Sequence, residues 1–139
     1  MKKILIFTIA LMFNISVFSQ ATYTSQASGN WNSASTWSIS GTDSDSNGIP
    51  DSNDTVVIGH DVTVSDAQAA NTVTVNFSGS PTLTISGSSS TLTTTSNFTN
   101  NSDVIISGGA ASDPATLTVN GDLQQDGNLT VGAGQRLVM

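Results

Sequence analysis

Short runs in which apolar residues alternate with Thr, Ser or Asn fill the chain from residue 55 onward. This period of two is typical of β-strands with one buried face and one face in water. In residues 72–77 it puts Val73, Val75 and Phe77 on one face. Ser-Gly, Asn-Gly, Asp-Gly and Gly-Gly pairs between the runs favour turns. The predicted strands cover residues 55–58, 61–65, 72–77, 82–86, 91–95, 103–107, 116–119 and 136–138.

A weak internal repeat links two of the later segments, because the pattern of residues 97–109 recurs at residues 122–134. The corresponding pairs are Phe98 and Leu123, Val104 and Leu129, and Ile106 and Val131, each 25 residues apart (123 − 98, 129 − 104, 131 − 106). A second phrase, TLTISG at Thr82 and TLTVNG at Thr116, recurs at a different shift of 34 residues (116 − 82).

A repeat in the low to middle twenties has the length of one layer of a β-solenoid. A single layer cannot bury its apolar face, whereas stacked layers form a continuous core. We therefore predict an all-β fold with almost no helix, built as a parallel β-solenoid. An antiparallel β-sandwich uses the same alternation and stays open as the alternative.

The first residues have the pattern of a secretory signal peptide. Lys2 and Lys3 precede an apolar run from Ile4 to Phe18, and the small residue Ser19 follows. The run has 15 residues, whereas a membrane span needs about 20. We expect cleavage near Ser19, so residues 1–19 are a signal peptide, 20–54 a Trp-containing cap with an acidic loop, and 55–139 solenoid layers.

Charge narrows the choice of partners. The formal charge is −7, and removal of Lys2 and Lys3 makes it −9 (−7 − 2). All ten acidic residues are Asp, and Arg136 is then the one remaining Lys or Arg. Nucleic acid and anionic lipid need Lys and Arg, so this surface predicts no nucleic-acid binding and no stable membrane insertion. The absence of cysteine means that packing or a metal must hold an exported domain together.

The stretch DSDSNGIPDSND, residues 43–54, has the ligand spacing of a calcium loop. Asp43, Asp45, Asn47, Gly48, Asp51 and Asp54 occupy places 1, 3, 5, 6, 9 and 12 of this window. Ile49, at place 7, would contribute its backbone carbonyl. The alternative is an acidic surface turn without metal. We expect a calcium ion here, held by the side chains of Asp43, Asp45, Asn47, Asp51 and Asp54.

Trp31 and Trp37 lie six residues apart, and an even separation puts both on one face of an extended chain. They are either a hydrophobic plug at the start of the fold or a pair of exposed rings that stack on sugars. We favour the plug, because a small domain with few large apolar residues needs them inside.

A spaced pattern of aromatic, glycine and apolar residues runs through the first half of the exported chain. Its members are Trp31, Trp37, Gly48, Pro50, Asp54, Val56, Ile58, His60, Val62 and Val64. This pattern resembles the N-terminal region of bacterial secreted surface proteins and is similar to the extracellular eight-glycine domain. The resemblance implies a right-handed parallel β-helix, often exported by the type IX pathway, in a long surface, adhesion or polysaccharide-associated protein. It also implies further layers beyond GQRLVM, so we expect the solenoid to be incomplete at the C-terminus.

Candidate catalytic groups are few. His60 is the one histidine and is interpreted as a turn residue between two strands. Arg136 is the one candidate base for a lyase in the exported chain. We predict a secreted or cell-surface structural or adhesion module that is not an enzyme and contacts polysaccharide or other surface proteins. The alternatives are a carbohydrate-binding module with Trp31 and Trp37 exposed, or a fragment of a polysaccharide-acting β-helix enzyme.

Overall fold

The structure is a computed structural model that describes residues 20–139. The expected signal peptide, residues 1–19, lies outside the described residues. Within residues 20–139, strands account for the regular structure, apart from the short 3₁₀ turn η1 (Ala34–Thr36). None of the helical structure in this range has the length and apolar character needed to span a membrane.

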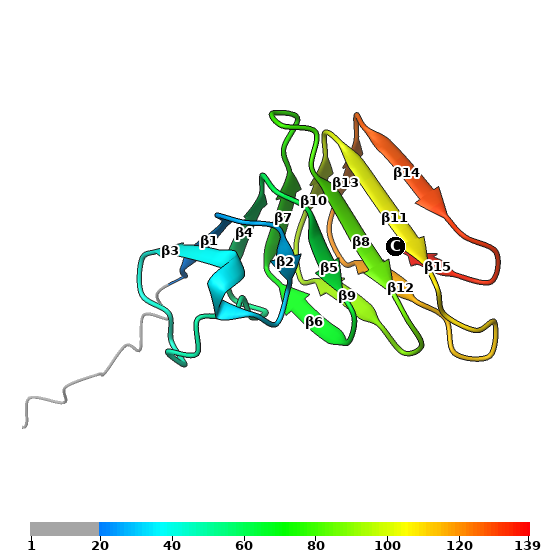
Figure 1. The fold of residues 1–139 in the computed structure, drawn as a ribbon, viewed down its shortest axis with the longest axis horizontal. Helices are drawn as coiled ribbons and strands as arrows, with labels where there is room; N and C mark the ends of the chain where they lie inside the picture. Colours follow the sequence, from blue (N-terminus) through cyan, green and yellow to red (C-terminus); the bar gives the residue numbers. More distant parts are fainter. Residues whose placement is uncertain (1–19) are drawn as a thin grey trace, which may run out of the picture.

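The strands form three sheets (Figure 1). The first, sheet A, contains β3 (Trp37–Ser40), β1 (Thr22–Ser25), β4 (Thr55–Ile58), β7 (Thr72–Val75), β10 (Phe98–Asn100) and β13 (Leu123–Gln125), in that order. Sheet B contains β2 (Gly29–Asn30), β5 (Val62–Val64), β8 (Thr82–Ser86), β11 (Asp103–Ser107) and β14 (Asn128–Val131). Sheet C contains β6 (Ala67–Ala70), β9 (Thr91–Thr94), β12 (Thr116–Val119) and β15 (Arg136–Val138).

From β4 onward, consecutive strands belong to different sheets, and each sheet gains a strand each time the chain returns to it. Thus β7, β8 and β9 pair with β4, β5 and β6. Among the described strands, every pair is parallel except β1 with β3, which is antiparallel. The protein is therefore all-β with a β-helix-like arrangement. Parallel pairing between strands far apart in sequence excludes the antiparallel sandwich.

The strand register confirms the 25-residue repeat. Phe98 pairs with Leu123, and Val104 pairs with Leu129. The shift of 34 residues, by contrast, does not correspond to a layer. Thr82 pairs with Asp103 in sheet B, whereas Thr116 pairs with Thr91 in sheet C. The two similar phrases lie in different sheets, because the same alternation suits any strand with one buried face.

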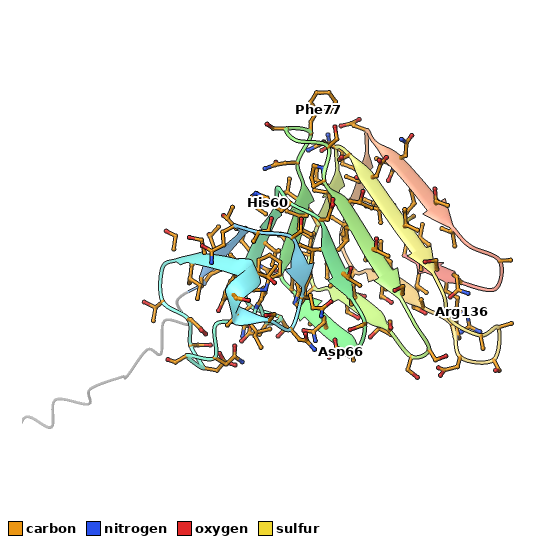
Figure 2. All side chains as sticks on the ribbon, in the orientation of Figure 1. His60, Asp66, Phe77 and Arg136 are labelled. Carbon is orange, nitrogen blue, oxygen red and sulfur yellow. The ribbon has the colours of Figure 1, made fainter. Side chains whose placement is uncertain are left out.

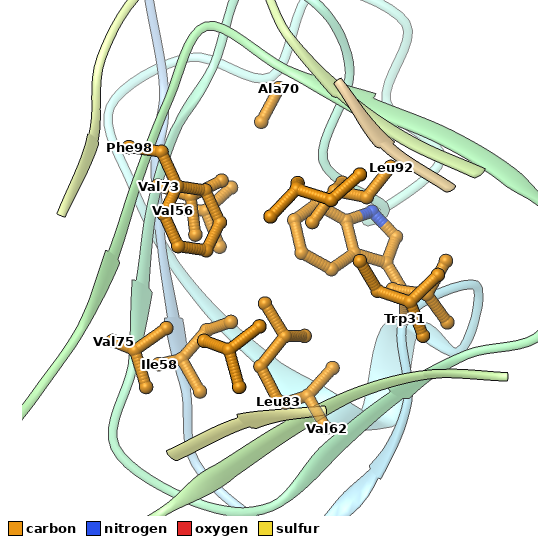
Figure 3. Close-up of a cluster of buried hydrophobic side chains, with 14 of the residues drawn as sticks. Trp31, Val56, Ile58, Val62, Ala70, Val73, Val75, Leu83, Leu92 and Phe98 are labelled. Atoms are coloured by element: carbon orange, nitrogen blue, oxygen red, sulfur yellow. The ribbon is translucent and has the colours of Figure 1, made fainter. Parts of the chain in front are cut away.

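Apolar side chains from successive layers stack in columns inside the molecule (Figure 3). The column of sheet A contains Tyr23, Val56, Val73, Phe98 and Leu123. The matching column of sheet B contains Val62, Leu83, Val104 and Leu129, and that of sheet C contains Leu92, Leu117 and Leu137. Each Val, Leu or Ile buried in this way stabilises the fold by about 1.5–3 kcal/mol relative to exposure.

The segment 20–54 shares these sheets. β1 pairs with β4, and β2 pairs with β5, so sheets A and B both begin before residue 55. β3 folds back on β1 and covers the outer edge of sheet A at the N-terminal end (Figure 1). This cover satisfies backbone groups that an open parallel edge would leave unpaired.

Two local predictions need correction. Phe77 does not continue the inward face of Val73 and Val75, because β7 ends at Val75 and the chain turns outward. Phe77 is 81% exposed. The strands β1, β2 and β3 of segment 20–54 were not predicted, and neither was β6, since AQAA has little intrinsic strand preference. The strand β6 forms because its backbone pairs with β9 along four residues.

Candidate functional site

The acidic loop, residues 41–54, joins β3 to β4 at the N-terminal end of the fold. Ile49 packs against the hydrophobic core, and Pro50 is buried. Gly48 has a φ of +76°, which favours glycine, and an added Cβ would lie 3.0 Å from the Cβ of Ala34. The loop is thus fastened to the body of the protein at its centre, while most of its polar residues stay exposed.

The first half of the loop is a chain of turns closed by side-chain oxygens. Oδ1 of Asp43 accepts a hydrogen bond from the Asp45 backbone N–H at 3.2 Å, and Oδ2 accepts one from the Gly48 N–H at 2.9 Å. Oδ1 of Asp45 accepts the Asn47 N–H at 3.2 Å, and Oδ1 of Asn47 accepts the Ile49 N–H at 2.6 Å. Three of these four bonds join the side chain of residue i to the backbone N–H of residue i+2, the pattern of Asx turns.

The second half of the loop is organised by Asp54, which is only 4% exposed. Its carboxylate accepts hydrogen bonds from the backbone N–H of Ala21 at 3.1 Å and of Asp51 at 3.0 Å. Its backbone carbonyl accepts the N–H of Asn71 at 2.8 Å. Asp54 therefore ties the end of the loop to the start of β1 and to the residue before β7.

Removal of the Asp54 carboxylate should destabilise the fold. Asp54→Ala leaves the Ala21 and Asp51 N–H groups without their acceptor, and the bond to Ala21 is buried. We expect the free energy of unfolding to fall by about 1–3 kcal/mol, the cost of an unsatisfied buried donor. Urea unfolding in the presence of a chelator measures this loss. The exposed Asp122→Ala is the control, and an equal effect of both variants would contradict the anchoring role of Asp54.

The carboxylates of the loop perturb one another. The Gly48 N–H, which donates to Asp43, lowers the pKa of that carboxyl to about 2. Hydrogen bonding with Asp43 raises the pKa of Asp45, and the Asp45 backbone N–H donates to the same Asp43 carboxylate at 3.2 Å. Burial raises the pKa of Asp54. At neutral pH the first two groups carry like charges at short range, an arrangement that a bound cation relieves.

The Tyr23 hydroxyl is a buried polar group beside these carboxylates. Burial raises the pKa of this hydroxyl far above its ordinary value, and the interaction with the Asp43 carboxylate acts in the same direction. The contact with Asp43 falls short of regular hydrogen-bond geometry. Tyr23 therefore places a buried polar group against the first carboxylate of the loop.

The present side-chain positions do not form a closed metal cage. Within residues 20–139, no three His, Cys, Asp or Glu side chains lie close enough together to hold an ion. The oxygens of Asp43, Asp45, Asn47, Asp51 and Asp54 accept hydrogen bonds from the loop itself. Each carboxylate oxygen has a second lone pair, so the donor set suits a hard cation such as Ca²⁺.

Trp31 and Trp37 are core residues, with exposed fractions of 0% and 3%. Their ring centroids are 5.2 Å apart with an interplanar angle of 73°, an edge-to-face contact. Nε1 of Trp37 donates to the carbonyl oxygen of Trp31 at 2.7 Å. Neither ring presents a face to solvent. The alternative in which these two residues stack on sugars therefore does not hold, and the rings form the hydrophobic plug.

His60 lies in the turn between β4 and β5, as expected. Its Nδ1 is 2.7 Å from the backbone carbonyl oxygen of Ser25, and Oγ of Ser25 accepts the N–H groups of Gly59 and His60. Arg136 begins β15, far from His60 along the length of the molecule (Figure 2). The structure therefore does not bring these two groups together.

The sequence prediction missed a hollow beside Phe77. Its lining residues are Phe77, Ser80, Asn101, Ser102, Asp103, Asp126, Gly127 and Asn128. The run Ser-Gly-Ser-Pro after Phe77 favours a turn, so the sequence could have shown that the strand ends before residue 77 and that Phe77 lies in a turn beside the hollow.

No family model matches this chain. Searches of curated proteins and of solved structures also find no significant match. The resemblance to secreted surface proteins therefore stays a prediction, and the function has to be argued from the fold and from the residues described above.

Proposed function

We propose that the protein is a secreted or cell-surface structural and adhesion module, built as a right-handed parallel β-helix and steadied by calcium at the acidic loop. The observation that carries this proposal is the stacking of aliphatic columns through all three sheets. Such a stack makes a stiff, extended scaffold whose outward Thr and Asn side chains face water. Its acidic composition suits a calcium-rich exterior.

The surroundings of His60 support a role without catalysis. One ring nitrogen lies against the Ser25 carbonyl oxygen, and the nearby serine hydroxyl accepts two backbone N–H groups. The contact leaves Nε2 of His60 free, but a general base also needs a nucleophile within reach, and no hydroxyl in residues 20–139 makes a hydrogen bond to this nitrogen. In this turn the His60 and Ser25 groups serve instead to join β1 to the β4–β5 turn.

Asp43, Asp45, Asn47, Asp51 and Asp54 would hold the calcium ion, together with the backbone carbonyl of Ile49. The turns that bring Asp43, Asp45 and Asn47 together support this assignment, since each side chain accepts a backbone N–H of the same short loop. Binding requires the exposed side chains to turn from their own loop toward the ion. Because Ile49 and Asp54 fasten the loop to the core, the ion would resist opening of the N-terminal end.

Calcium should raise the melting temperature. An extracellular site binds calcium with a Kd of about 10⁻⁴–10⁻³ M. At about 10 mM calcium the folded state then gains about 1.4–2.7 kcal/mol, which raises the melting temperature by several degrees. Thermal unfolding followed by circular dichroism, with calcium and with a chelator, measures the difference.

The variant Asp45→Ala should abolish this rise, because it removes one member of the carboxylate pair. Asp122→Ala, outside the loop, should keep it. Magnesium at the same concentration should stabilise less, since Mg²⁺ favours a smaller octahedral shell that retains water. Identical melting curves with calcium and with chelator would remove the ion from the proposal, while the scaffold role would stand.

A further inference from the structure

One corner of the molecule, where the chain passes from sheet A to sheet B, carries a series of turns in register. They are residues 59–61, 76–81, 101–102 and 126–127. The turn at residues 76–81 is the longest of the four and overhangs the two that follow. Figure 2 shows Phe77 at the tip of this turn, pointing away from the body of the protein.

Hydrogen bonds and backbone angles within the turn keep Phe77 outside the core. The Ser80 N–H donates to the Phe77 carbonyl at 3.3 Å, and both Gly79 and Ser80 have positive φ angles, +85° and +49°. Non-glycine residues in this region are uncommon and concentrate at functional sites. The Asn76 N–H donates to Ile58 at 2.9 Å, which fixes the start of the turn. The aromatic ring of Phe77 is therefore carried by a hydrogen-bonded turn.

Phe77 borders a hollow of about 320 Å³, whose other walls are the turns of the next two layers. The buried Asn100 holds these two turns together. Its Nδ2 donates to the Asn128 carbonyl at 2.9 Å, its Oδ1 accepts the Ser102 N–H at 3.1 Å, and its carbonyl accepts the Asp126 N–H at 2.8 Å. The polar wall of the hollow thus has a fixed geometry.

Two carboxylates line the hollow, and its lining contains no basic side chain. Oδ1 of Asp103 accepts from Asn128 Nδ2 at 2.8 Å, and Oδ2 of Asp126 accepts from Gln124 Nε2 at 2.6 Å. Each carboxylate keeps its second oxygen for a ligand. Arg136 lies at the opposite side of the molecule in Figure 2. An anionic ligand would therefore meet repulsion here, whereas hydroxyl groups would find acceptors.

We propose that this hollow is a binding site for a neutral glycan, with Phe77 as the stacking platform. The C–H groups on one face of a pyranose carry partial positive charge and pack on the negative face of an aromatic ring. The hydroxyls at the edge of the same sugar would donate to Asp103 and Asp126 and bond to the amide of Asn101. One exposed apolar surface beside a few fixed polar groups is the usual composition of a small-ligand site.

A glycan fits the site better than a protein partner. A stable protein interface buries about 800 Å² on each side around a cluster of apolar anchors. Phe77 is the one large aromatic side chain exposed among the described residues, and the other lining residues are polar or glycine. A sugar needs no larger apolar surface than this ring. The proposal concerns ligand recognition and is independent of calcium at the acidic loop.

The test is isothermal titration calorimetry of the purified full chain with cellohexaose, laminarihexaose, mannohexaose and xylohexaose. At least one should bind, and Phe77→Ala should weaken that binding about three- to tenfold. The control Ile39→Ala removes another exposed apolar side chain, 42% exposed on β3, and should leave the affinity unchanged. Asp126→Asn should also weaken binding, because it exchanges an acceptor for a donor.

Fluorescence of the buried Trp31 and Trp37 shows whether each variant is folded. An anionic hexamer of galacturonate should not bind. Failure of all four neutral hexasaccharides to bind, or equal affinity of the native chain and Phe77→Ala, would overturn the proposal. Binding of hexalysine in place of the neutral sugars would also overturn it, since it would indicate a peptide-binding surface.

Discussion

Phe98→Ala should lower the free energy of unfolding by about 3–5 kcal/mol, the usual cost of a deleted core aromatic side chain. Phe98 is 1% exposed and lies between Val73 and Leu123 in the column of sheet A. The adjacent layers fix the strand spacing, so the surrounding side chains cannot close the cavity. The loss is a large part of the 5–15 kcal/mol that holds a domain of this size.

Phe77→Ala is a matched control for this variant, because it makes the same chemical change at a residue that is 81% exposed. It should change the stability by no more than about 0.5 kcal/mol. Urea unfolding followed by tryptophan fluorescence measures both. Phe98→Leu keeps most of the side-chain volume and should lose much less. Equal losses from Phe98→Ala and Phe77→Ala would contradict the position of Phe98 in the core.

Gly127→Ala should destabilise the fold by about 1–3 kcal/mol or more, as overpacking does. An added Cβ at Gly127 would overlap the carbonyl oxygen of Ser102 and lie 2.5 Å from its nitrogen. Both atoms are backbone, so no side chain can rotate away. The two turns would have to separate, which would break the hydrogen bonds from Asn128 to Ser102 and from Gly127 to Asn100.

Gly59→Ala provides the contrast, since Gly59 lies in the turn of an earlier layer at the same corner. A Cβ there has no atom within 4 Å, and the stability should change little. Thermal unfolding of both variants gives the comparison. If Gly127→Ala were as stable as the native chain, the two turns could not be packed as closely as the structure has them.

The alternation of apolar and polar residues predicted most of the strands, including the last one at residues 136–138. The prediction succeeded because every layer buries one face, and the period of two follows from strand geometry. It failed at Phe77, where the period continues in the sequence after the strand has ended. Hydrophobic period alone does not contain the information that Gly79 and Ser80 adopt positive φ.

The acidic loop shows a different limit of prediction from the sequence. Its spacing predicts a calcium loop, and in the structure Asp43, Asp45 and Asn47 each accept the backbone N–H of the residue two places on. The spacing did not show that Asp54 is buried and holds the N–H of Ala21, a residue 33 positions away. Such an interaction depends on how the layers stack.

The sequence by itself determined that the chain forms short strands, each with one apolar face, and that acidic oxygens gather before the first regular run. Those properties are local, because strand period, turn preference and charge are set by neighbouring residues. Only the tertiary structure decided the partners of the strands outside the 25-residue repeat, settled the choice between buried and exposed Trp31 and Trp37, and placed Phe77 outside. These outcomes depend on contacts between residues far apart in sequence, where many registers satisfy the same alternation and close packing selects among them.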